Sequence, residues 1–399
     1  MMQWIRIWLV QIPVIAKRWL KPIQATSPEH LYALVDECIV QYGPKCPLNH
    51  IDVSQVTHME GLFRNRHFLG DISQWDVSRV QSMNHMFENC TFDGDIAGWN
   101  TSALRSMSSM FLKSPFNGDL SRWDTSNVED MNRAFYLSKF TGDISRWNIA
   151  KVKNLCEMFY GGSFNGDLSM WNTGQVRLMR GTFRNSAFNG DISKWNTSKV
   201  QYMNYLFERA EFNGDISRWN TSNVNTLNCA FFCSKFQGDL SEWDVSQVTN
   251  MAYALNGTPF AGDLSKWDVS KVEKFEGMLY ATPFQGDLSN WNVLSYAKLT
   301  RMLPLHYLGA VSPSLWQRMD AVEAFAADVA HEIKNPLTPI QLSAERLAMK
   351  LTDKLQPVEQ ALLAKSVKTI VDQVGAMKRL VDEFREYARL PAANLQALD

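Results

Sequence analysis

The sequence predicts an α/β repeat solenoid followed by an all-α helical hairpin. Two observations predict the solenoid: a Gly-Asp pair recurs every 24 residues from Gly70 to Gly286, and a Trp follows each of these glycines by five positions. A strict period between about 20 and 50 residues is typical of solenoids. A third observation predicts the hairpin, because beyond Pro304 this period disappears and apolar residues recur every three or four positions.

Six segments are predicted along the 399 residues. They are an apolar and basic segment at 1–27, a helical cap at 28–50, the repeats at 51–303, a linker at 304–316, the hairpin at 317–390 and a tail at 391–399. The formal net charge of −1 gives no general attraction to nucleic acid, and no nucleic-acid partner is expected. The six cysteines form no CxxC pair and are expected to be reduced, mostly buried thiols, with no metal site.

The N-terminal segment is apolar, but Arg6, Pro13 and Lys17 interrupt it, so it is too short to span a membrane. The charges lie inside the apolar run and no small-residue cleavage site follows, which disfavours a signal peptide. Trp residues beside basic residues leave membrane contact through 1–20 as an alternative. A loose or self-packed terminus is favoured over that contact, and a cytoplasmic location is expected.

The elements within one repeat are predicted from the example FNGDISKWNTSKV at 188–200 and the residues after it. Val200, Met203, Leu206 and Phe207 have the spacing of one face of a short helix. Ser198 precedes them and suits the N-cap of that helix. The segment GDIS is predicted to form a short strand after a glycine turn, so that stacked repeats form a parallel ladder with a spacing of about 4.8 Å.

Charged positions also recur from repeat to repeat. The Gly-Asp aspartates form a column from Asp71 to Asp287. We expect each carboxylate to accept backbone N–H bonds in its turn; a calcium ladder is the alternative, although the spacing matches neither an EF-hand nor the nonapeptide repeat. The residue before each Trp is basic in five of ten repeats but is Glu242 in one, which favours a solvated face over a basic stripe for an acidic partner.

The phrase LNHIDVSQVTHMEGLF (48–63), followed by FNGDISxWNTSxV units, resembles the DUF285 repeat family, relatives of the BspA-type leucine-rich repeats. The resemblance covers residues 28–303. It implies a helical N-terminal cap and a surface or interaction protein without enzymatic activity, whose protein ligand is unknown. Tyr296 replaces a repeat valine and the next Gly-Asp is missing, so the repeats are expected to stop near Leu303.

Two apolar stripes at heptad spacing predict the helices of the hairpin, and the short connection TDKLQP makes them antiparallel. Two helices cannot bury both stripes, so a homodimeric four-helix bundle through 317–390 is expected. The first stripe contains Val322, Phe325, Val329, Ile333, Leu337, Ile340, Ala344, Leu347 and Leu351, and the second Leu363, Val367, Ile370, Val374, Met377, Val381 and Phe384.

Inside the first helix, DVAHEIKNPLTP (328–339) places His331 on the face away from the apolar stripe. Pro336 and Pro339 remove helical hydrogen bonds and imply a bend beside this histidine. An exposed His flanked by Glu332 suits nucleophilic phosphate chemistry, because the carboxylate can orient the ring or accept its proton. An incidental surface histidine is the alternative.

This motif looks like the H-box of sensor histidine kinases, and the hairpin resembles their HisKA dimerisation and phosphotransfer domain over residues 315–395. The segments QLSAERL and VDEFREYARLP resemble NtrY-type kinases, whereas DAVEAFAADVAHE looks closer to another subfamily. The resemblance implies that His331 is the phosphoacceptor, Glu332 its acid/base partner and Asn335 a residue that assists phosphatase chemistry. A response-regulator receiver domain is the implied partner.

Such kinases follow the hairpin with an ATP-binding domain, and we expect none before Asp399 and no P-loop. Autokinase activity is therefore not expected, no cofactor is expected in this chain, and ATP and Mg²⁺ would act only through a kinase domain in trans. The predicted function is a two-component phosphoacceptor module coupled to a protein-binding solenoid. The alternative is a non-enzymatic scaffold, at the cell surface if the usual setting of the repeat family applies, whose hairpin only dimerises or is a fusion remnant.

Overall fold

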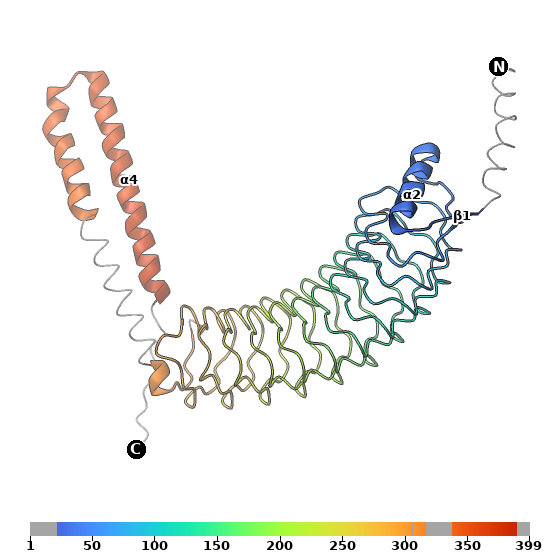
Figure 1. The fold of residues 1–399 in the computed structure, drawn as a ribbon. Helices are drawn as coiled ribbons and strands as arrows, with labels where there is room; N and C mark the ends of the chain where they lie inside the picture. Colours follow the sequence, from blue (N-terminus) through green and yellow to red (C-terminus); the bar gives the residue numbers. More distant parts are fainter. Residues whose placement is uncertain (1–21, 305, 317–336, 389–399) are drawn as a thin grey trace.

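The computed structural model describes residues 22–304, 306–316 and 337–388 (Figure 1). In chain order it contains a small N-terminal cap around helix α2, a long curved stack of repeats and a helical hairpin. Helices and strands are few, and the repeats consist almost entirely of turns joined by isolated bridges. The C-terminal part is helical, as the sequence predicts.

The N-terminal cap covers the first repeat. Strand β1 (Ile23–Gln24) pairs in parallel with strand β2 (Ile51–Asp52), and helix α2 (Pro28–Tyr42) lies between them in the chain. The hydroxyl of Ser27 accepts a hydrogen bond from the N–H of His30 at 3.2 Å and so caps the first turn. One face of α2 packs into the core through Leu31, Val35 and Cys38.

Parallel bridges connect the repeats at the 24-residue period. They run from His58 to Lys298, and each bridge residue between these two ends pairs with its equivalents one repeat earlier and one repeat later. The prediction of one short helix and one short strand in each repeat is wrong. The GDIS-type segments contain no strand in the described repeats, and the bridge residue Tyr202 lies inside the segment predicted to be helical.

Successive turns replace the predicted helix, and their hydrogen bonds alternate. In residues 203–210, the N–H groups of Leu206 and Glu208 donate to the carbonyls three residues earlier, both at 3.2 Å. The N–H groups of Tyr205, Phe207 and Arg209 donate instead to carbonyls of the next repeat, at 2.9, 2.7 and 2.7 Å. Half of the backbone donors thus join neighbouring repeats, so a continuous helix cannot form, although the turns still place apolar residues three or four positions apart.

Columns of aromatic side chains fill the core. Phe183 and Phe207 stack with ring centroids 5.6 Å apart, Phe188 and Phe212 at 6.3 Å, and Trp195 and Trp219 at 6.3 Å. All of these rings are at most 3% exposed. Each repeat therefore buries its apolar face against its neighbours, and the stability of the stack is collective.

The Gly-Asp turns are stabilised locally, as expected. All ten aspartates accept a hydrogen bond from the backbone N–H two residues later, at 2.8–2.9 Å. The prediction for Ser198 is wrong, because Ser198 caps no helix. Its N–H donates to Oδ1 of Asn196 at 3.1 Å, so the amide and not the hydroxyl holds this turn.

The segment after Leu303 packs on the last repeat, where a linker was expected. The ring of Tyr307 stacks on Phe284 at 5.9 Å, and Val311 forms a parallel bridge with Leu288. Leu315 is fully buried. The stack therefore ends with a partial repeat, whose aromatic residue follows Phe284 by 23 positions and so departs from the period by one.

The hairpin consists of a helix at 337–351, a short 3-10 turn η1 (Thr352–Lys354) and helix α4 (Pro357–Ala388). The amide of Gln360 donates to the carbonyls of Thr352 and Leu355 at 2.8 and 3.0 Å and fixes the connection. Nζ of Lys378 donates to Oε1 of Gln341 at 3.0 Å across 37 residues. The two helices therefore run antiparallel, as predicted.

Candidate functional site

The predicted site residues His331, Glu332 and Asn335 lie outside the described residues, as does the bend predicted beside them. Their roles remain predictions. The described part of the hairpin begins at Leu337, two positions after Asn335. Leu337 belongs to the first predicted apolar stripe.

The apolar stripes of the hairpin are only partly covered within one chain. Leu337, Ala344, Val374 and Val381 are buried. Ile340, Leu347 and Ile370 from the same stripes remain 49%, 55% and 41% exposed. These three side chains line an open apolar groove together with Pro339, Ser343 and Ala344.

The repeats present a second candidate site, a surface built on left-handed backbone. Two positions in each repeat, four residues apart, have φ between +49° and +69°. Most of them are occupied by residues other than glycine, for example His85 and Asn89, Arg133 and Leu137, or Tyr205 and Arg209. The side chains at the first of these positions and three residues later form ladders along the stack.

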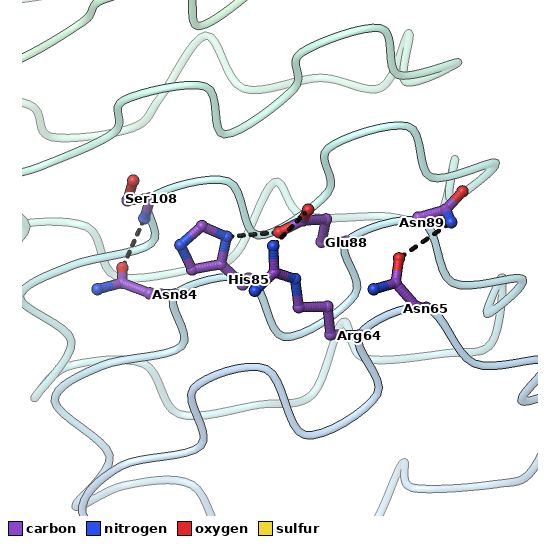
Figure 2. Close-up of polar contacts among 7 residues, drawn as sticks. All are labelled: Arg64, Asn65, Asn84, His85, Glu88, Asn89 and Ser108. Carbon is purple, nitrogen blue, oxygen red and sulfur yellow. Dashed lines mark hydrogen bonds and ion pairs between the residues drawn. The ribbon is translucent and has the colours of Figure 1, made fainter.

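At the N-terminal end this ladder is polar (Figure 2). Oε1 of Glu88 accepts a hydrogen bond from Arg64 at 3.1 Å, and Oε2 of Glu88 lies 2.5 Å from Nδ1 of His85. Asn89 donates to Asn65 one repeat earlier at 3.0 Å. Contacts between equivalent positions of adjacent repeats account for most of this network.

In the middle repeats, arginine and tyrosine side chains occupy these ladder positions and, at Arg180, the position directly before the left-handed Gly181. We name this set the Arg–Tyr strip: Arg133, Tyr136, Tyr160, Arg180, Arg184 and Tyr205. The rings of Tyr136 and Tyr160 stack at 4.4 Å. The guanidinium of Arg184 lies 5.4 Å from the ring centre of Tyr160 and 5.0 Å from that of Tyr205. Sequence reasoning missed this strip, because its residue types change from repeat to repeat and only the backbone geometry groups them.

Buried carboxylates support the strip. Arg133 and Arg180 contact the two oxygens of Glu157 at 2.6 and 3.5 Å, and Arg184 contacts Glu208 at 2.8 Å. The side chains of Glu157 and Glu208 are only 8% and 7% exposed. Each carboxylate thus lies beneath the guanidinium groups and orients them.

Other predicted features have structural roles. The backbone N–H and the hydroxyl of Ser193 lower the pKa of Asp191, as expected for a turn acceptor. The residue before the Trp forms an ion pair in one described case, between Lys266 and Glu242 at 2.5 Å. Among the described residues no group of three His, Cys, Asp or Glu side chains is placed to hold a metal ion.

The described cysteines are free thiols, and three of the six are buried. Burial raises the pKa of Cys38 to about 12 and that of Cys229 to about 11, so these thiols are protonated at neutral pH and are poor nucleophiles. In the described ranges no helix is both long enough and apolar enough to cross a membrane.

Two families match the chain. The family described as "Mycoplasma protein of unknown function, DUF285" matches residues 42–145, 137–232 and 203–306. The His Kinase A (phospho-acceptor) domain, HisKA, matches residues 321–393. No solved structure matches the chain.

Curated relatives are similar to the HisKA region alone. The nitrogen regulation protein NtrY of Azorhizobium caulinodans is 45% identical over 83 residues, which are 21% of this chain and 11% of that protein. A putative NtrY-like sensor histidine kinase of Rickettsia bellii is 42% identical over 83 residues, 21% of this chain and 13% of that protein. The sensor protein ChvG of Agrobacterium fabrum is 33% identical over 85 residues, 21% of this chain and 13% of that protein.

The chain therefore covers only a small fraction of the length of these relatives. The repeat geometry and the family matches agree along the chain, with one repeat family over 42–306 and one phosphoacceptor domain beyond it. The protein belongs to the DUF285 family through its repeats and carries a C-terminal HisKA domain.

Proposed function

We propose that the protein acts in two-component signalling, with repeats that bind a partner protein and a HisKA hairpin that exchanges phosphate with the receiver domain of a response regulator. The observation that carries this proposal is the HisKA match over 321–393, which includes His331. The similarity of the same region to proteins named as sensor kinases supports it.

In this proposal a neutral imidazole nitrogen of His331 attacks phosphorus. A new N–P bond forms while the bond from phosphorus to the leaving oxygen of the donor breaks. Glu332 orients the ring or takes its proton. Asn335 assists a separate phosphatase reaction, in which water attacks the phosphorus of the receiver aspartyl phosphate and the aspartate oxygen leaves. The donor is a receiver aspartyl phosphate, or ATP with Mg²⁺ bound by a kinase domain in trans.

The proposal includes two architectural steps. Residues 42–306 form a continuous solenoid, supported by the bridges that recur at 24 residues. The hairpins of two chains form a four-helix bundle, supported by the half-exposed Ile340, Leu347 and Ile370 on stripes that one chain leaves uncovered. We place this assembly in the cytoplasm, where receiver domains would reach it.

The second candidate is a scaffold without phosphotransfer. It is favoured by the repeats themselves, whose recurring Asp, Asn and Trp side chains are engaged in turn and inter-repeat hydrogen bonds. In that case the hairpin only dimerises.

A phosphotransfer assay separates the two candidates. The full chain is incubated with a receiver domain phosphorylated by acetyl [³²P]phosphate, and we expect acid-labile, alkali-stable label on His331. His331→Gln should abolish the label, whereas His306→Gln, at an exposed described histidine, should retain it. If the wild-type chain stays unlabelled with the phosphorylated receiver and also with a kinase domain and ATP, phosphotransfer is excluded and the scaffold function remains.

A further inference from the structure

We propose that the Arg–Tyr strip is a docking surface for an acidic segment of a partner protein. This inference rests on the proposed function, because it names the class of ligand that the repeats would bind. The strip extends beyond Tyr205 through Arg209, whose guanidinium lies 5.9 Å from the ring centre of Phe232.

The strip presents cations outward. The side chains of Arg133 and Arg180 are 45% and 50% exposed, whereas the carboxylates that contact them are almost completely buried. The guanidinium groups of the strip and of Arg209 lie 5.0–5.9 Å from the centres of aromatic rings, which restricts their conformations. Holding an arginine in this way lowers the conformational entropy that it would lose when it binds a carboxylate.

The fold does not require these residues, and the other repeats demonstrate this. The position of Arg133 is occupied by Ser109 in the preceding repeat and by Gly181 two repeats later, and both have the same left-handed backbone. The position of Tyr136 and Tyr160 is Leu112 in one repeat and Asn256 in another. The core Trp column, by contrast, is identical in all ten repeats. The run of arginine and tyrosine is therefore a local addition to a scaffold that stacks without it.

The chemistry favours an acidic polypeptide. Arginine binds carboxylates in a planar, two-pronged geometry, and Arg and Tyr are enriched where protein interfaces concentrate their binding energy. Nucleic-acid binding commonly neutralises about six to ten phosphates. The strip with its extension offers four arginines, two buried glutamates offset part of their charge, and the whole chain has a net charge of −1.

The test measures binding to the full chain by fluorescence anisotropy. The probe is a fluorescein-labelled 20-residue Glu-rich peptide; the same peptide with Lys for Glu and a 20-nucleotide single-stranded DNA are the comparison probes. We expect the Glu peptide to bind the wild type, and Arg180→Gln/Arg209→Gln to weaken its binding at least tenfold. Both positions are exposed, so the exchange removes charge with little loss of packing.

The matched control is Arg122→Gln/Arg218→Gln, which removes the same charge beside the aspartate column and should change the affinity less than twofold. Equal weakening by both double variants, no weakening by the strip variant, absence of binding by the wild type, or DNA binding as tight as peptide binding would overturn the proposal. The strip variant should still accept phosphate on His331, so a failure of docking is distinguishable from a failure of phosphotransfer.

Discussion

The indole Nε1 of Trp195 donates a hydrogen bond to the carbonyl oxygen of Leu168, 27 residues earlier, at 3.0 Å. The same bond is made by all ten repeat tryptophans. Each donates to the carbonyl of the Ile or Leu 27 residues earlier, from Trp75 with Leu48 to Trp291 with Leu264. The Trp column thus joins neighbouring repeats by packing and by a directed polar contact.

We therefore expect Trp195→Phe to destabilise the repeats although it retains an aromatic ring. The carbonyl of Leu168 would lose one of its two donors and keep only the backbone N–H of Trp171, at 3.2 Å. The lost hydrogen bond costs about 0.5–1.5 kcal/mol, and the smaller ring leaves a void that adds to this cost. Urea unfolding followed by circular dichroism measures the loss. Met170→Ala, at a side chain that is 78% exposed, is the control and should leave the midpoint unchanged.

Two repeat glycines, Gly214 and Gly98, predict opposite results for one substitution. A Cβ at Gly214 would lie 2.8 Å from Cε2 of Phe212, within the packed Phe column, whereas a Cβ at Gly98 would contact nothing within 4 Å. We expect Gly214→Ala to cost about 1–3 kcal/mol, as overpacking does, and Gly98→Ala to be neutral or slightly stabilising. Similar unfolding midpoints for both variants would contradict the packing described for this column.

The sequence predicts the period of the repeats and the aspartate turns, because both depend on residues that recur without change. It also predicts parallel pairing between repeats, but at the GDIS segments and not at the observed bridge positions such as Tyr202. It does not predict the conformation within a repeat. Val200, Met203 and Phe207 have helical spacing, yet alternate N–H groups such as those of Tyr205 and Phe207 bond to the next repeat. These hydrogen bonds depend on the carbonyl groups of the neighbouring repeat. The apolar pattern within one segment therefore cannot predict them.

The candidate sites differ in the same way. The His331 motif is contiguous and can be recognised from sequence alone. The Arg–Tyr strip is assembled from four repeats, and Arg184 contacts Tyr160 and Tyr205 only because the period places equivalent positions side by side. Its residues follow no repeat consensus, so it becomes visible only in three dimensions.

The aspartate column predicts sensitivity to acid. Hydrogen bonds from Ser193 lower the pKa of Asp191 below its ordinary value of about 3.9, and the equivalent aspartates Asp119, Asp143, Asp167, Asp215 and Asp263 behave alike. A lowered folded-state pKa contributes stability that is complete above the unfolded pKa and is lost as the pH falls through the folded pKa. We expect the free energy of unfolding to decrease below about pH 4.

Substitution separates the charge of this aspartate from its hydrogen bond. Asp191→Asn keeps an acceptor, as Asn196 does in its own turn, so at pH 7 it should cost little, whereas Asp191→Ala should cost about 1 kcal/mol. Asp191→Asn should also reduce the acid dependence slightly. Denaturant titrations at pH 7 and pH 3 measure both effects, and equal losses for Asn and Ala at pH 7 would show that the turn bond does not stabilise the fold.

We expect the hairpin to form a dimer that a single substitution can dissociate. Ile370 lies on the half-exposed stripe of α4 and lines the open groove with Ile340 and Leu347. If a second chain covers this groove, Ile370→Glu buries an unpaired carboxylate at the interface, which is strongly unfavourable. Light scattering should then give twice the chain mass of 45.6 kDa for the wild type and the single mass for the variant. Val358→Glu, on α4 but away from the stripe and 82% exposed, should leave the dimer intact. A wild-type monomer would contradict the four-helix bundle, and a dimer that survives Ile370→Glu would assign association to another part of the chain.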